Sequence, residues 1–276
     1  MVDLLCVPIR YQSYGNDNMS MEKYQNETVK DKLKKAFSLS EDSASNEEIR
    51  TRLLDGGKVT GTNMCVLVCA MVIASVGLNV SSTAVIIGAM LISPIMGSIL
   101  ASAYASTSGN YTLLRNHTIG FGLQIAISVT AATIYFLFSP VKEPTVELLA
   151  RTSPTFFDVL IAFFGGLAGI IGQTRVDKTN TVIPGVAIAT ALMPPLCTCG
   201  FSIANGRWDM LLGAGYLFII NAYFIFLSAS VILSVLKIPK TKELTEKQWK
   251  RHRLRMIRNT IIIAVPSIVA LYSMLP

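Results

Sequence analysis

Two proline-containing strings interrupt apolar segments and could open the helix backbone to a solute. Ser93-Pro94 and Pro194-Pro195 each lie in the middle of such a segment. Proline removes an amide donor and clashes with the preceding helical turn, and in hydrocarbon the freed carbonyls must be satisfied by protein or by water. The pattern predicts two broken helices around a solute or ion pathway, with packing kinks as the alternative. The residues expected to line this pathway are Ser93, Pro94, Gly97, Pro194, Pro195 and Thr198.

Two carboxamides, Gln124 and Asn221, also lie well inside apolar segments. An uncharged polar side chain in hydrocarbon must find a hydrogen-bond partner. That partner is either a neighbouring helix or a bound solute, and both interpretations remain open. We include both residues in the predicted pathway.

One acidic residue, Asp158, lies one turn inside the end of an apolar segment. Its carboxylate is expected either to bind a cation or proton in the pathway or to cap an interface. The centres of the apolar segments hold no carboxylate, lysine or histidine, so a buried proton relay is hard to build. His117 falls in a polar loop, where we expect it to be solvated.

No enzyme, cofactor or metal site is expected. The sequence contains no HExxH, GxSxG or phosphate-loop motif. Cys65 and Cys69, and likewise Cys197 and Cys199, lie in apolar segments without a nearby histidine, which favours packing over metal binding. The net charge of +7 is explained by cytoplasmic loops, so a nucleic-acid partner is not expected.

Seven apolar segments are long enough to position these residues across a bilayer. The chain has 276 residues, of which only 15% are charged, and a mean hydropathy of +0.51, which is typical of a membrane protein. A helix of about 20 residues crosses a hydrocarbon layer of about 30 Å. The predicted spans are residues 62–80, 83–105, 117–138, 156–174, 181–203, 210–236 and 257–275.

The distribution of Lys and Arg predicts the orientation. Nine precede the first span, one lies in the second loop, two in the fourth and nine in residues 237–258, which are the sixth loop and the first residues of the seventh span, whereas the other loops hold only Lys142, Arg151 and Arg207. Positive residues stay on the cytoplasmic side. The expected location is the prokaryotic cytoplasmic (inner) membrane, with the N-terminus cytoplasmic and the C-terminus outside.

Residues 83–124 resemble residues 184–221. The matched positions are Pro94 and Pro195, Tyr111 and Trp208, and Gln124 and Asn221. Each copy belongs to a set of three spans, and because three is odd, the second set must enter the membrane in the opposite orientation. Inverted repeats with interrupted helices are typical of many secondary transporters, and some channels use them as well.

The predicted fold is an all-α polytopic membrane protein with two inverted three-helix repeats, a seventh transmembrane helix and a short cytoplasmic N-terminal helical region. That region is expected to hold helices over 27–39 and from the Ser45–Glu48 capping box to Gly56–Gly57. The expected regions are a cytoplasmic helical segment at 1–60, membrane repeat 1 at 61–138, membrane repeat 2 at 154–236, and a basic interfacial segment with the final transmembrane helix at 237–276.

Residues 242–258 combine basic and apolar side chains, which predicts an interfacial helix on the anionic cytoplasmic leaflet, worth about 1 kcal/mol per basic residue. A regulatory lipid site is the alternative. The expected lipid-surface residues are Lys247, Trp249, Lys250, Arg251, Arg253 and Arg255.

Small residues four apart on the fourth span allow close helix approach. They are Ala162 with Gly166, and Gly165 with Gly169. Packing within the chain is the favoured interpretation, and the glycine-rich faces also suggest a homo-oligomer.

The strings AVIIGAMLISPIMGSI (84–99), FFDVLIAFFGGLAG (156–169) and PGVAIATALMPPL (184–196) resemble a widespread prokaryotic membrane family, catalogued as domain of unknown function three hundred and eighty-nine. The resemblance covers roughly residues 50–236, and Asp158 with its surrounding glycines matches the family's pattern. It implies the membrane core and brings no established activity.

The residues favour a transporter-like protein that moves a small neutral or anionic solute through a central site at the broken second and fifth spans. The scarcity of buried charge argues against a cation site made of several carboxylates. An ion channel built on the same inverted repeats is one alternative. A non-transporting membrane scaffold or sensor, acting through the N-terminal helices and residues 242–258, is the other.

Overall fold

The described part of the chain is helical. The structure, a computed structural model, describes residues 42–176 and 182–240, then 245, 250, 254, 256–263 and 265; residues 182–191 are described by their backbone. The predicted helix at 27–39 lies outside these residues. The helices are α3 (Asn46–Gly56), α4 (Gly61–Asn79), α5 (Thr83–Ile92), α6 (Ile95–Thr107), α7 (Tyr111–Phe138), α8 (Val146–Leu149), α9 (Phe156–Thr174), α10 (Val182–Ala204) and α11 (Trp208–Val235). The all-α prediction is confirmed over this part of the chain.

Several of these helices are long and apolar enough to cross a membrane. Over the described residues they are α4, α7, α9 and α11, and α5 with α6 makes a fifth span if the bent pair is taken as one. The predicted fifth span corresponds to α10, whose described side chains form a shorter apolar stretch, Leu192–Ala204. Most of the predicted seventh span, 257–275, lies outside the described residues, so the count of seven stays a prediction.

Two sets of helices follow each other along the chain. We call residues 61–138 (α4 to α7) the N-half and residues 156–235 (α9 to α11) the C-half. The first helix of each half, α4 or α9, has 19 residues. The last helix, α7 or α11, has 28. Positions in one half can therefore be compared with positions in the other by counting from the start of each helix.

The turn that enters the last helix has the same hydrogen bonds in both halves. Gly109 and Gly206 have φ of 74° and 67°, a left-handed conformation that glycine adopts at little cost. The amide of Asn110 donates to the carbonyl of Ala105, and the amide of Arg207 donates to that of Ser202. Both are bonds across five residues that close the preceding helix, as in a Schellman-type end.

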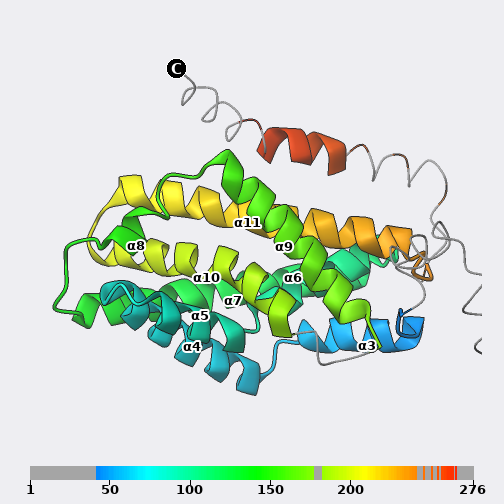
Figure 1. The fold of residues 1–276 in the computed structure, drawn as a ribbon, viewed down its shortest axis with the longest axis horizontal. Coiled ribbons are helices and arrows are strands. Elements are labelled where there is room, and N and C mark those ends of the chain that lie inside the picture. The colour runs from blue at the N-terminus through cyan, green and yellow to red at the C-terminus, as the bar shows by residue number, and fades with distance from the viewer. Residues whose placement is uncertain are drawn as a thin grey trace, which may run out of the picture. The chain divides into compact units, whose positions relative to one another are not determined.

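Helix α10 lies at the centre of the bundle. It contacts α4, α5, α6, α7, α9 and α11, and Figure 1 shows it between α11 on one side and α4, α5 and α7 on the other. Its described side chains from Leu192 to Ser202 are buried.

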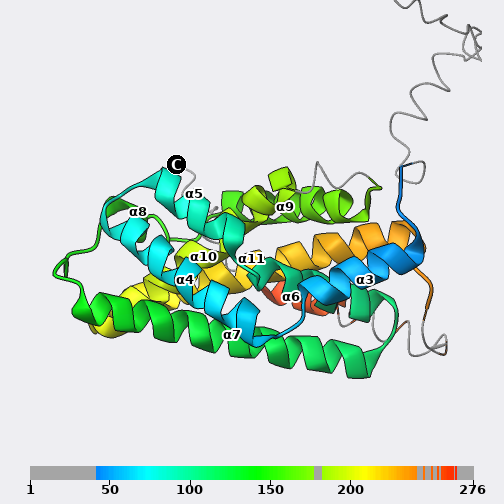
Figure 2. The same ribbon diagram turned by 90° about the horizontal axis from the view of Figure 1, so that it is seen from below.

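Helices α7 and α11 run in opposite directions, as the colours in Figures 1 and 2 show. Each packs against the first helix of its own half, α7 against α4 and α11 against α9. Each also packs against the middle element of the other half, because α7 contacts α10 and α11 contacts α6. The packing of the two halves is therefore reciprocal.

Candidate functional site

The second predicted span is interrupted at Ser93-Pro94, as the sequence suggests. Helix α5 ends at Ile92, and α6 begins at Ile95 with its axis bent by 47°. Ser93 is extended, with φ −76° and ψ 129°, which is the conformation that a following proline favours. Pro94 caps α6 at φ −80°, where its missing amide falls outside the regular hydrogen-bond ladder. The break exposes Leu91 and Ile92 to about half of their surface.

The fifth predicted span is not interrupted, so the prediction of a second break is wrong. Pro194 and Pro195 lie inside α10, which continues from Val182 to Ala204. The hydroxyl of Thr198 donates to the carbonyl of Pro194 at 2.9 Å, within the same helix. The described side chains of α10 around the two prolines are buried among six other helices, whereas Leu91 and Ile92, just before Pro94, are exposed. Tertiary packing therefore overrides the helix-breaking tendency of the two prolines.

Gly97 packs against α3. A Cβ atom at this position would overlap the carbonyl oxygen of Gly56. Ala101 lies one turn after Gly97 on α6, and a Cβ atom added at Gly57 would overlap the Cβ atom of Ala101. The small residues of the second span therefore permit a backbone-to-backbone contact with the C-terminal end of α3.

Helix α3 joins the two halves at one end of the bundle. Ser45 caps it, as predicted, by accepting from the amide of Glu48 at 3.2 Å, and Ile49 and Leu53 are buried. The amide of Ala44 donates to the carbonyl of Thr174 at 2.8 Å, which ties this segment to the end of α9.

His117 contributes to the same contact, and its predicted place in a solvated loop is wrong. It lies in α7, half-buried, with Nδ1 3.3 Å from the carbonyl oxygen of Gly57. The predicted span begins at residue 117, whereas α7 begins six residues earlier, at Tyr111, so His117 lies in the second turn of a helix that extends beyond the apolar segment.

Gln124 and Asn221 are both buried, and each is the fourteenth residue of the last helix of its half. Three residues before them, Phe121 and Phe218 stack on each other with ring centroids 6.0 Å apart. Because α7 and α11 are antiparallel, the two carboxamides lie on opposite sides of this stack along the bundle. Both oxygen and nitrogen of the Gln124 amide have no hydrogen-bond partner within the described residues.

Three serines that the sequence analysis did not single out resemble Gln124. Ser75 on α4, Ser98 on α6 and Ser128 on α7 are fully buried, and within the described ranges their hydroxyl oxygens have no hydrogen-bond partner. The polar neighbour of Ser75 is the Cys197 thiol, a weak hydrogen-bonding group. All three serines belong to the N-half.

Asp158 caps α9. Its Oδ2 accepts from the amide of Thr155 at 2.7 Å and from the hydroxyl of Thr155 at 2.8 Å. In the N-half the corresponding cap is made by Thr60 and Asn63. The backbone amide of Asn63 donates to the Thr60 hydroxyl at 3.3 Å. The carboxylate therefore caps the start of α9, a role different from the two predicted for it, and its place in the pathway stays a prediction.

The glycine-rich face of α9 is covered within the same chain. Ala162, Gly165, Gly166 and Gly169 are buried, and a Cβ atom at Gly166 would overlap the hydroxyl of Ser228 and crowd Ile225 on α11. This face therefore packs inside the bundle and is not free for self-association.

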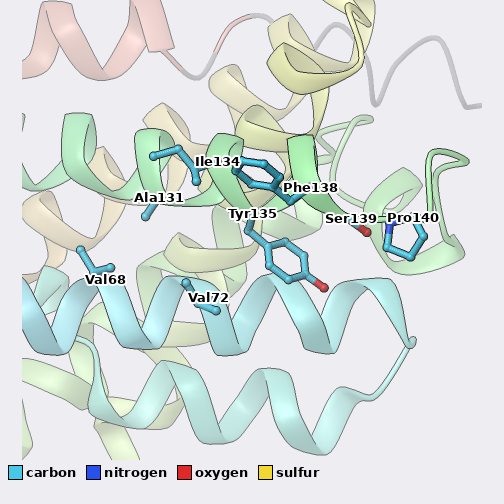
Figure 3. A pocket seen from close by; sticks show the side chains of 8 residues that line it. All are labelled: Val68, Val72, Ala131, Ile134, Tyr135, Phe138, Ser139 and Pro140. Atoms are coloured by element: carbon cyan, nitrogen blue, oxygen red, sulfur yellow. The ribbon is translucent and has the colours of Figure 1, made fainter.

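An apolar groove of about 440 Å³ lies between α4 and the end of α7 (Figure 3). Val68 and Val72 line it from α4, opposite Tyr135 and Phe138. None of the residues predicted to line a pathway belongs to this groove. The predicted lipid-surface residues are not described apart from Lys250, which is exposed.

Comparison with known proteins places the chain in a family. Residues 90–227 match the family described as a domain of unknown function, DUF389. The uncharacterized protein MJ0678 of Methanocaldococcus jannaschii is 27% identical over 209 residues, which cover 76% of this chain and 63% of that protein. No solved structure matches the chain. With half of its length matched by the family model, the chain belongs to the DUF389 family.

Proposed function

We propose that the protein is a transporter-like integral membrane protein whose two halves are inverted repeats, with a solute site between them near the break at Ser93-Pro94. The observation that carries this proposal is the reciprocal packing of the two halves around the stack of Phe121 on Phe218.

These two phenylalanines are the eleventh residues of α7 and α11. When matching positions of two copies contact each other, a twofold axis must pass between them, as in an isologous interface. The exchange of partners between α7–α10 and α11–α6 is the other sign of such an axis. Equal helix lengths and the repeated glycine turn support the same relationship.

In this proposal each half spans the membrane three times, and α10 is counted as a full span of 23 residues. A seventh span at 257–275 follows the repeats. The end that carries α3 faces the cytoplasm of a prokaryotic cell, because most Lys and Arg lie at that end or in residues 237–258. In the same proposal the basic residues of 242–258 bind anionic membrane lipids.

Transport is supported by the kind of interruption found in α5 and α6. Broken helices near the bilayer midplane are tolerated where they are buried or line a cavity, and transporters use them at repeat interfaces. The break faces α10, the central helix, which contacts both α5 and α6. A small solute held there would lie between the two halves, where their relative movement changes access.

Cysteine labelling tests the inverted arrangement. Tyr111 and Trp208 are the first residues of α7 and α11, and both are exposed. In a cysteine-free background, Tyr111→Cys should react with a membrane-impermeant maleimide only from the cytoplasmic side, and Trp208→Cys only from the opposite side. Labelling of both from one side would contradict the inverted repeat.

Reconstitution into liposomes tests transport. Saturable uptake of a solute from a panel of neutral and anionic compounds is expected. Unitary currents in a planar bilayer would instead indicate a channel. Absence of both, together with a partner protein retained through residues 27–58, would overturn the proposal in favour of a scaffold or sensor.

A further inference from the structure

We propose that the N-half contains a binding site for a small, uncharged solute that both donates and accepts hydrogen bonds. This inference rests on the proposed transport function and narrows its substrate class. Its evidence is the group of four buried polar side chains that have no nitrogen or oxygen hydrogen-bond partner within the described residues; beside Ser75 there is only the weakly bonding thiol of Cys197. We call this group the polar cluster; its members are Ser75, Ser98, Gln124 and Ser128.

The polar cluster is costly unless something satisfies it. A buried polar group without a partner costs about 1–3 kcal/mol, and in a bilayer no water reaches it through the hydrocarbon. The four members lie on α4, α6 and α7, and α7 packs against both of the other helices. Buried polar groups in native proteins are satisfied by protein, ordered water or ligand. A solute that enters the N-half would supply the missing bonds.

The C-half shows that this polarity is not a general property of the fold. Ser75 is the fifteenth residue of α4, and the fifteenth residue of α9 is Ile170. Ser128 is the eighteenth residue of α7, and the eighteenth of α11 is Ile225. Both isoleucines are fully buried. These two positions are therefore polar in the N-half and apolar in the C-half, whereas Gln124 is matched by a second carboxamide, Asn221.

Buried hydroxyls of the C-half are also satisfied differently. Thr198 donates to the carbonyl of Pro194, Ser202 to that of Thr198, and Ser228 to that of Ile225, each within its own helix at 2.7–2.9 Å. Such bonds to the preceding turn are the usual way in which Ser and Thr are accommodated in helices. The hydroxyls of the polar cluster make no such bond among those the structure records.

Helix α10 brings two further acceptors to this region. Because proline has no amide hydrogen, Pro194 and Pro195 leave the carbonyls of Thr190 and Ala191 without their usual helical donors. Ala132 of α7 lies directly against Gly200, and Phe136 packs edge-to-face against Phe201, so α7 and α10 run in the same direction.

The stripe of α7 that makes these contacts continues toward the polar cluster. Its buried residues recur every fourth position, at Gln124, Ser128, Ala132 and Phe136. Counting back two turns from Ala132 on α7 and from Gly200 on α10 places Gln124 level with the residues just before Pro194. The two N–H groups of its amide are therefore close in depth to the carbonyls that lack their usual helical donors.

The chemistry of this site selects a neutral ligand. The cluster offers hydroxyls and a carboxamide, which donate and accept, and α10 adds carbonyl oxygens, which accept. Among the acidic, basic and histidine side chains of the described spans, Asp158 and Asp209 lie in the first turns of their helices, and Arg115 and His117 are the fifth and seventh residues of α7. A bound ion would be buried without a counter-charge, which is expensive. Small polyols and amides fit this set of groups.

Solute flux through the full chain in liposomes tests the inference, with glycerol and urea as neutral probes and rubidium and chloride as ionic probes. We expect glycerol or urea to enter protein-containing vesicles at least tenfold faster than empty ones, as measured by light scattering during reswelling. Ionic flux without glycerol or urea flux would overturn the neutral site while leaving the transport function intact. Absence of flux for all four probes would overturn both.

Variants locate the site. Gln124→Leu should lower the neutral flux about tenfold, since it removes two hydrogen bonds to the solute. Ser128→Ala should lower it about threefold. Ser228→Ala is the matched control, because this buried serine also lies on the last helix of its half but is already bonded, to Ile225. Equal flux in Gln124→Leu and the unmodified protein would overturn the site.

Thermal stability in detergent distinguishes a solute-binding role of Gln124 from a role in joining two helices. If the Gln124 amide joined two helices, Gln124→Leu would lower the unfolding temperature. An unpartnered amide predicts an unchanged or higher temperature, because its replacement by an apolar group removes an unsatisfied group. A destabilised Gln124→Leu variant would therefore overturn the proposal, whatever its flux.

Discussion

The N-half and the C-half share helix lengths and a repeated turn but differ in their middle element. In the N-half the middle element is two helices, α5 and α6, with a bend of 47° at one proline. In the C-half it is the single helix α10, which contains two prolines and no interruption. The number of prolines therefore does not decide where a helix breaks. What decides it is the packing around the proline itself. Pro194 and Pro195 are buried among six helices, whereas Pro94 is half-buried and follows the exposed Leu91 and Ile92.

The halves differ in their interior as well. Unsatisfied hydroxyls and the Gln124 amide gather in the N-half, while Thr198, Ser202 and Ser228 of the C-half are bonded within their helices. The broken element and the polar cluster therefore belong to the same half. This division suggests that the C-half supplies a rigid frame and the N-half supplies the adaptable, solute-facing part.

The largest expected difference between the halves is in how much the protein is destabilised when a glycine that contacts a neighbouring segment is replaced by alanine. Gly97 of the N-half contacts Gly56 of α3, and Gly213 of the C-half contacts the carbonyl of Thr152. Gly97→Ala should destabilise the protein by about 3 kcal/mol, the upper part of the range for overpacking, because α3 is a regular helix that cannot yield locally. Gly213→Ala should cost about 1 kcal/mol, since Thr152 lies in a short connection that can shift.

Thermal unfolding in detergent and trypsin cleavage within α3 would measure this difference. Gly97→Ala should speed cleavage after the exposed Arg50, because α3 would leave α6. Gly88→Ala is the control, since nothing lies within 4 Å of a Cβ atom at that glycine. Equal losses for Gly97→Ala and Gly213→Ala would show that the two halves are covered with equal rigidity.

Replacement of a proline by alanine is expected to change the stability by a smaller amount, with opposite signs in the two halves. Pro195→Ala should stabilise the protein by about 1 kcal/mol, since it returns an amide donor to the interior of a continuous helix. Pro94→Ala should destabilise it by about 1 kcal/mol, because proline at a helix start is pre-organised and its missing amide is not needed there.

Apparent unfolding temperatures of the two variants, compared under the same detergent and lipid conditions, check this prediction. A gain in stability from both substitutions would mean that the bend at Pro94 is strained in the same way as α10, and the proposed distinction between the middle elements would fail.

Sequence patterns predicted the elements of this bundle better than their packing. Hydropathy located α4, α7, α9 and α11, and the Ser45–Glu48 box located the start of α3. These features depend on local chemistry: apolar length and capping side chains. The break at Ser93-Pro94 was predicted on the same grounds, and the identical argument was wrong at Pro194-Pro195, because the neighbours of α10 could not be known from its own sequence.

The candidate site was only partly predictable for a related reason. Gln124 was recognised because a carboxamide is rare in an apolar helix. Ser75, Ser98 and Ser128 gave no such signal, since serine is common in membrane helices and is usually bonded to its own backbone. Their interest depends on which face of each helix is buried and on what lies opposite, and both are set by the arrangement of helices in space.

The smallest expected difference concerns the caps that begin the first helix of each half. Asp158→Asn should destabilise the protein by about 0.5 kcal/mol, because it removes a negative charge from the N-terminus of α9, where the helix dipole favours it. Asn63→Asp adds that charge to α4 but loses the bond from Asn63 Nδ2 to the carbonyl of Lys58 at 2.9 Å, so its net effect should be close to zero. Unfolding temperatures and neutral flux should be measured together. If Asp158→Asn abolished flux without lowering stability, the carboxylate would belong to the pathway, and the C-half would contribute chemistry as well as a frame.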